Sequence, residues 1–95
     1  MQKRVTVSEL DAIIKRINII TGSPIEPYAT GADGKAIPQA GNYHLSGAYG
    51  GYSLHRMVPS GGITDVFRCG HVTARELRDL MWAFITGLDT AKGDE

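Results

Sequence analysis

Two segments of the chain carry apolar residues at the three- and four-residue spacing that gathers them on one side of a helix. In the first, over about residues 6–21, the apolar positions are Leu10, Ile13, Ile14, Ile17 and Ile20. In the second, over about residues 73–86, they are Leu77, Leu80, Met81, Phe84 and Ile85, with Leu88 just beyond. The pattern predicts one amphipathic helix near each end of the chain.

Both predicted helices begin with the same capping signal. Thr6 and Thr73 each precede a glutamate by three residues, which is the spacing of a capping box. A valine stands directly before each threonine and a leucine follows four residues after it, as in a hydrophobic staple. Gly22 predicts the end of the first helix, and Gly87 predicts the end of the second.

Between the helices, short stretches of alternating apolar and polar residues replace the helical period. Residues 42–48, 52–58 and 63–68 are predicted to form strands, separated by glycine-containing turns. Residues 23–41 hold three of the four prolines and an Asp-Gly turn signal, which predicts a loop or a small hairpin. We therefore expect an α+β fold: an N-terminal helix, an antiparallel meander of about three strands, and a C-terminal helix, with both helices packed on one face of the sheet.

The length and composition narrow the class of protein. A chain of 95 residues corresponds to one domain, over residues 1–95, and we expect an ordered core of about residues 5–88 and a frayed tail over 89–95. The formal net charge of zero argues against a duplex DNA binder, which needs excess cations. A single cysteine, Cys69, is typical of a reducing cytosol, and no apolar run is long enough to span a membrane. We expect a cytoplasmic protein.

The candidate chemistry is concentrated between residues 42 and 71, which contain all three histidines and three of the four tyrosines. Tyrosine and histidine rings stack on bases, arginine matches phosphate with its planar fork, and glycine lets a backbone N–H approach a ligand. Together these groups predict a site for a nucleotide-type ligand. The candidate binding residues are Tyr43, His44, Tyr49, Gly50, Gly51, Tyr52, His55, Arg56, Arg68 and His71.

Other interpretations of the same residues remain open. Tyrosine and histidine are also ordinary strand residues, so the segment could be purely structural. His44, His55, Cys69 and His71 are all possible zinc ligands, but their spacing matches no standard zinc site. Cys69 could act as a nucleophile activated by His71 or His55. We predict no metal, no cofactor and no catalytic residue.

The last predicted helix offers a second surface. Trp82 falls off its apolar face, and an exposed tryptophan is typical of a protein interface. Arg75 and Arg78 lie on the polar face of the same helix. We predict that these three residues belong to an interface.

The run Asn-Tyr-His-Leu-Ser-Gly-Ala-Tyr-Gly-Gly-Tyr-Ser-Leu-His-Arg-Met at 42–57, with Gly-Gly-Ile-Thr-Asp-Val-Phe at 61–67 and Gly-His-Val at 70–72, resembles small proteins of tailed bacteriophages and prophages. The resemblance covers about residues 10–88. That group has no assigned activity, so the resemblance supplies no catalytic residues. It implies a bacterial cytosol during infection, and a role in blocking host defence by sequestering a messenger or by binding a defence complex.

Three functions follow as expectations. The first is a non-enzymatic homo-oligomer that sequesters a nucleotide-derived immune messenger, such as a cyclic nucleotide or a cyclic ADP-ribose isomer. Tyr43, Tyr49, Tyr52 and His55 would contact the bases, and Arg56, Arg68 and the backbone of residues 50–51 would hold phosphate. The second is a protein–protein inhibitor of a host defence complex such as a CRISPR effector. The third is a small phosphodiesterase or hydrolase.

Overall fold

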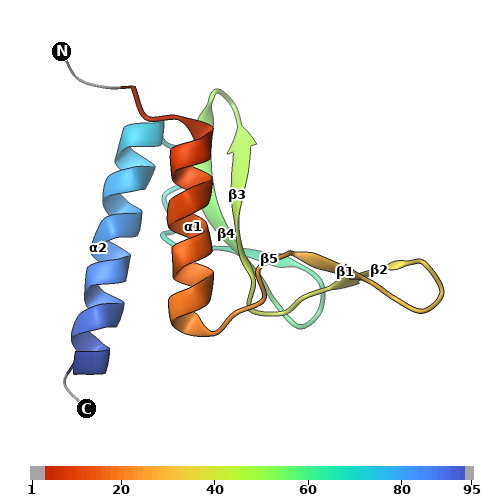
Figure 1. Ribbon diagram of the computed structural model, residues 1–95. Helices are drawn as coiled ribbons and strands as arrows, with labels where there is room; N and C mark the ends of the chain where they lie inside the picture. Colours follow the sequence, from red (N-terminus) through yellow and green to blue (C-terminus); the bar gives the residue numbers. More distant parts are fainter. Residues whose placement is uncertain (1–3, 94–95) are drawn as a thin grey trace.

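The first helix forms where its capping signal predicts it. The computed structural model describes residues 4–93, and helix α1 spans Val7–Thr21 (Figure 1). The Thr6 hydroxyl accepts a hydrogen bond from the Glu9 backbone N–H at 3.2 Å and so caps the helix. At the other end Gly22 adopts a left-handed conformation with φ of 68°, as helix C-caps commonly do.

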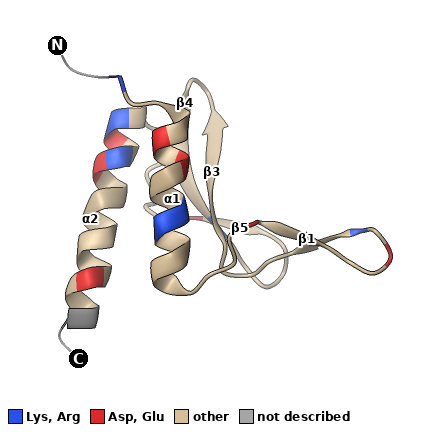
Figure 2. Cartoon of the chain, viewed as in Figure 1, with Lys and Arg blue, Asp and Glu red and all other residues tan. Residues whose placement is uncertain are grey.

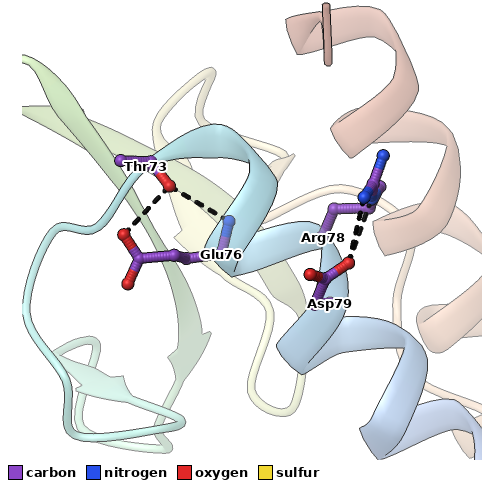
Figure 3. A network of polar contacts seen from close by, with 4 residues as sticks. All are labelled: Thr73, Glu76, Arg78 and Asp79. Carbon is purple, nitrogen blue, oxygen red and sulfur yellow. Dashed lines mark hydrogen bonds and ion pairs between the residues drawn. The ribbon is translucent and has the colours of Figure 1, made fainter. Parts of the chain in front are cut away.

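The second helix, α2 (Ala74–Gly93), is longer than predicted. Its capping box is complete, because the Thr73 hydroxyl accepts from the Glu76 N–H at 3.1 Å and donates to the Glu76 carboxylate at 3.0 Å (Figure 3). Gly87 does not end the helix, and the predicted frayed tail is wrong as far as residue 93. A glycine inside a helix costs only about 1 kcal/mol relative to alanine, and it keeps its backbone hydrogen bond. The last two residues of the chain lie outside the described part.

The predicted meander is a three-stranded antiparallel sheet in the order β3 (Tyr43–Ala48), β4 (Gly51–Met57) and β5 (Ile63–Asp65). The β3–β4 turn has two residues with positive φ, Tyr49 at 54° and Gly50 at 73°, as in a type I′ hairpin. Strand β5 is shorter than predicted and ends before Arg68, whose φ of 55° is incompatible with a strand.

Residues 23–41 contain a small hairpin, one of the two alternatives that the sequence allowed. It pairs β1 (Tyr28–Thr30) with β2 (Ala36–Pro38) in a separate two-stranded sheet. The Asp33 carboxylate accepts from the Lys35 N–H at 3.0 Å and stabilises the turn. Figure 1 shows this hairpin, which we call the arm, projecting from the body of the molecule.

Both helices pack on one face of the three-stranded sheet, so the predicted α+β architecture is confirmed (Figure 1). Directly paired residues point to the same face of a sheet. The inner face, toward the helices, carries Tyr43, Leu45, Gly47, Tyr52, Leu54 and Arg56. The outer face carries His44, Ser46, Ala48, Gly51, Ser53 and His55. The buried core between sheet and helices consists of Leu10, Ile13, Ile14, Ile17, Tyr43, Leu54, Leu77, Met81 and Ile85, with Val5 at its margin.

A buried amide joins α1 to the sheet. The Asn18 side chain accepts from the Tyr43 N–H at 2.8 Å and donates to the Tyr43 carbonyl at 2.9 Å. Asn18 is 1% exposed, so these bonds form without competition from water. They fix where β3 starts relative to the helix, and hence which of its residues face outward.

Charged residues of both signs are interspersed over the body of the molecule (Figure 2). The first turns of α2, for example, alternate basic and acidic residues (Figure 2). Within residues 4–93, neither helix combines the length and the apolar composition that a bilayer crossing requires.

Candidate functional site

The predicted binding residues do not line one pocket, because the strands place them on opposite faces of the sheet. Tyr43, Tyr52 and Arg56 lie on the inner face, and His44 and His55 lie on the outer face. The alternation of side chains along a strand makes this division unavoidable for neighbours in sequence. The sequence interpretation, which treated these residues as one binding surface, therefore needs to be corrected to two separate surfaces.

The two tyrosines on the inner face are part of the packed structure. Tyr43 is 5% exposed and packs against Phe84 of α2, with ring centroids 5.9 Å apart. Tyr52 is half-buried, and its backbone exchanges two hydrogen bonds with Val72 at 2.7 and 2.8 Å. A ring that is already packed in the core has no open surface on which a base can stack.

On the outer face the structure brings all three histidines of the chain together. The ring centroids of His44 and His55 are 5.9 Å apart, and those of His55 and His71 are also 5.9 Å apart. Both pairs meet edge to face, and all three rings are half-buried. We call these three side chains the histidine row. It crosses β3, β4 and the segment that follows β5.

His71 reaches the row because the segment after β5 returns to the edge of β4. The Tyr52–Val72 bridge holds this segment in place. Gly51 makes room for it: a Cβ at position 51 would lie 2.9 Å from the Val72 carbonyl oxygen. The His71 ring then lies over the outer face, where its Nε2 is 3.0 Å from the Ser46 hydroxyl. Gly51 thus has a structural role, because its lack of a side chain leaves room for the segment that carries His71.

Asp65 is fixed beside the middle histidine. Its two carboxylate oxygens accept hydrogen bonds from the backbone N–H groups of Arg68 at 3.0 Å and Gly70 at 2.9 Å. Burial alone would raise the pKa of this carboxyl, but these bonds, the nearby Ser53 hydroxyl and the charge of His55 outweigh it and lower the pKa. Asp65 is therefore a carboxylate at neutral pH, opposite His55 in the strand register.

Ser53 lies beneath this group of side chains. It is fully buried, and its hydroxyl lies close to the Asp65 carboxylate, whose pKa it helps to lower. Ser53 thereby supports the carboxylate that stands beside the middle histidine.

Two members of the histidine row, His44 and His55, have a pKa below the ordinary value for histidine. Burial is the main cause that lowers the pKa of His44, and repulsion from His55 adds to it. Burial also lowers the pKa of His55, where the charge of Asp65 raises it and that of His71 lowers it again. Neutral imidazoles can both donate and accept hydrogen bonds, and each can take up a proton when an anion approaches.

Two strained residues flank the histidine row. Tyr49, in the β3–β4 turn, is 98% exposed, and its ring centroid lies 6.0 Å from that of His71. Arg68 is exposed in the loop after β5. Among the described residues these are the two non-glycine positions with positive φ. This conformation is uncommon for bulky residues, and such positions cluster at functional sites. Gly50 completes the turn that presents Tyr49.

Sequence reasoning missed three polar residues of this site: Ser46, Ser53 and Asp65. The strand period could have identified Ser46, since it stands two residues after His44 and so shares its face. A two-residue turn at positions 49–50 then pairs it with Ser53. Asp65 could not be assigned in this way, because its position depends on the loop that follows β5.

The alternative zinc and thiol sites lack the geometry they need. Within the described part of the chain, no three His, Cys, Asp or Glu side chains are grouped closely enough to hold a metal ion. Cys69 is exposed, and its Sγ lies 3.5 Å from the Gly70 carbonyl oxygen rather than beside a histidine nitrogen.

The predicted interface residues lie on the side of α2 away from the core. Trp82 is 45% exposed, and Leu80, which the pattern assigned to the apolar face, is also exposed. Arg78 pairs with Asp79 at 3.1 Å (Figure 3), and Arg75 is exposed in the first turn. These residues form a surface separate from the histidine row.

We compared the chain with protein-family models, with curated proteins and with solved structures, and none of the three comparisons gives a match.

Proposed function

We propose that this protein binds a nucleotide-type ligand, of the cyclic nucleotide or cyclic ADP-ribose kind, on the outer face of its sheet and holds it without catalysis. The observation that carries the proposal is the histidine row, in which three imidazoles lie together on one sheet face above a buried serine, with the exposed Tyr49 ring next to His71. The setting, sequestration of an immune messenger in the cytoplasm of an infected bacterium, is supported by the resemblance to phage proteins.

The protein offers a suitable group for each part of such a ligand. The Tyr49 ring is open on both sides, and stacking of a base on an aromatic side chain contributes about 1–3 kcal/mol. The histidines supply hydrogen bonds and, once protonated, positive charge for phosphate. Arg68 is exposed on the loop that Asp65 holds in place, and its guanidinium is suited to bind phosphate.

Replacement of Tyr49 by asparagine is expected to weaken ligand binding at least tenfold and to stabilise the fold. Asparagine accepts positive φ in a type I′ turn, so relief of strain is expected to raise the free energy of unfolding by about 1 kcal/mol. Isothermal titration with cyclic dinucleotides, cyclic trinucleotides and cyclic ADP-ribose isomers measures the binding, and urea unfolding measures the stability.

The matched control is Tyr28→Asn, which removes an exposed tyrosine from the arm and should leave affinity unchanged. A His55→Ala variant, lacking the middle ring of the row, should lose at least tenfold in affinity. The proposal fails if none of these compounds gives heat with the wild-type protein, or if Tyr49→Asn and His55→Ala bind as tightly as the wild type.

One observation favours a second candidate, a small phosphodiesterase or hydrolase. The Ser46 hydroxyl and the His71 Nε2 are 3.0 Å apart, which is the spacing of a nucleophile and its general base. The two functions differ in the fate of the ligand. Recovery of intact ligand after incubation and denaturation supports sequestration, and recovery of a cleaved product supports the hydrolase.

The proposal includes self-association, for which the arm is the supporting feature. An isolated two-stranded hairpin is marginally stable in water. The arm pairs with no strand of the larger sheet, yet it exposes Tyr28 at 52% and Ile37 at 50%. These residues lie on its two opposite faces, since Tyr28 pairs with Pro38 and Ile37 pairs with Ala29. Contact with a second copy of the chain would cover them.

Removal of the arm is therefore expected to convert an oligomer into a monomer. The Gln39 N–H donates to the Pro27 carbonyl at 2.8 Å, so residues 28–38 can be replaced by an Asn-Gly turn without moving the ends. Light scattering coupled to size-exclusion chromatography gives the mass of each form, and circular dichroism checks that the shortened chain is folded. A monomeric wild type, or an armless variant that keeps the wild-type mass, would contradict this part of the proposal.

A further inference from the structure

A groove on the other side of the sheet is independent of the histidine row. It has a volume of about 650 Å³ and opens between Phe84 of α2 and the inner face at Tyr43 and Arg56. This volume is in the range of small-molecule sites, which are typically about 300–1,000 Å³. Most of its wall is apolar, formed by Met57, Val58, Pro59, Val66 and Phe84. Such a wall accommodates an aromatic or aliphatic body.

One cation stands in this apolar wall. The Arg56 guanidinium carbon lies 4.9 Å from the centroid of the Tyr43 ring, and its Nε donates to the Gly41 carbonyl at 3.4 Å. Within residues 4–93, no carboxylate forms an ion pair with Arg56. The tyrosine ring and the carbonyl restrict the orientation of this exposed guanidinium, while its terminal N–H groups have no acceptor among the described residues.

The combination is complementary to one class of ligand. A planar guanidinium binds a carboxylate or sulfonate with two parallel hydrogen bonds, and the contacts of Arg56 with Tyr43 and Gly41 reduce the entropy lost on binding. The apolar wall next to it favours a hydrocarbon body. We propose that this groove binds small amphipathic organic anions, with the head group on Arg56 and the body against Phe84 and Val66.

The groove and the histidine row are separated by the sheet itself. Arg56 and His55 are consecutive in β4, so their side chains leave the strand on opposite faces. A ligand on Arg56 therefore does not touch the histidine row. The amphipathic-anion site does not depend on the proposed nucleotide site, and either proposal can fail alone.

The test uses two fluorescent probes with the same kind of aromatic body. Anilinonaphthalene sulfonate carries an anionic head group, and N-phenylnaphthylamine has none. The wild-type protein should bind the sulfonate saturably and more tightly than the amine. Arg56→Gln should weaken sulfonate binding about tenfold or more while changing amine binding less than about twofold. Decanoate should displace the sulfonate.

Two further variants make the result specific. Arg16→Gln removes an exposed arginine of α1 far from the groove in sequence, and it should leave sulfonate binding unchanged. Arg56→Lys keeps the charge but lacks the planar fork, so its affinity should lie between those of the wild type and Arg56→Gln. Urea midpoints of all variants show whether the fold is intact. Equal binding of the two probes, or sulfonate binding that Arg56→Gln does not weaken, would overturn the proposal.

Discussion

Replacement of Asn18 by leucine is expected to lower the free energy of unfolding by about 2–4 kcal/mol, although the two side chains are similar in size. The Asn18 amide makes two hydrogen bonds, one to the N–H and one to the carbonyl of Tyr43. Leucine can make neither, and both backbone groups of Tyr43 would stay buried without a partner. Each buried unsatisfied polar group costs roughly 1–3 kcal/mol. Urea unfolding followed by circular dichroism measures the change.

A control on the same helix separates this effect from a general response to leucine. Lys15 is exposed on α1, and Lys15→Leu should change the free energy of unfolding by less than about 0.5 kcal/mol. If Asn18→Leu were as stable as Lys15→Leu, the amide would not be the link between α1 and β3. The start of β3 would then have to be set by apolar packing alone.

The elements that depend on local chemistry could be predicted from the sequence. Both helices begin at their capping threonines, and the three-stranded meander follows from short alternating stretches between glycine turns. The end of α2 could not be predicted in this way. Gly87 is a residue type that often ends helices, but here it stays helical and α2 continues to Gly93.

The candidate site was harder to predict because it depends on tertiary contacts. The three histidines of the row were among the predicted candidates, but their grouping on one face was not predicted. Tyr43 and Arg56 are sequence neighbours of His44 and His55, and the prediction placed all four on one surface. Because side chains alternate along a strand, Tyr43 and Arg56 lie on the opposite face of the sheet. His71 joins the row through a loop that leaves β5 and returns to β4, and no periodic pattern encodes such a path.

The two proposed sites, on opposite faces of β4, offer anions different groups. On the outer face, half-buried imidazoles can gain charge when a ligand arrives. On the inner face, the cation is an arginine, a residue type that keeps its positive charge throughout the neutral pH range. Binding on the outer face should therefore depend on pH near neutrality, and binding in the groove should not.

The histidine row also predicts how stability responds to pH. Since the pKa values of His44 and His55 are lower in the folded protein than the ordinary value of 6.5, the unfolded chain binds more protons in this window. The free energy of unfolding should then fall as pH is lowered from about 7.5 to about 5, and the loss is complete below the lowered pKa values. Each excess proton in the unfolded state contributes at most about 1.4 kcal/mol per pH unit, and solvent at these half-buried rings reduces this.

Asp65 changes stability in the same direction as the histidines, but in a separate and more acidic window. Its pKa is lowered from 3.8, so the stability it contributes is present above that value and is lost only in stronger acid. Urea unfolding at several pH values between about 5 and 7.5 therefore reports on the histidines. In a His44→Gln/His55→Gln variant, the free energy of unfolding should change less with pH. If it did not change with pH in the wild type, the histidine row would not be desolvated. A phosphate ligand bound at the row would raise both pKa values, so saturating ligand should reduce or reverse the slope.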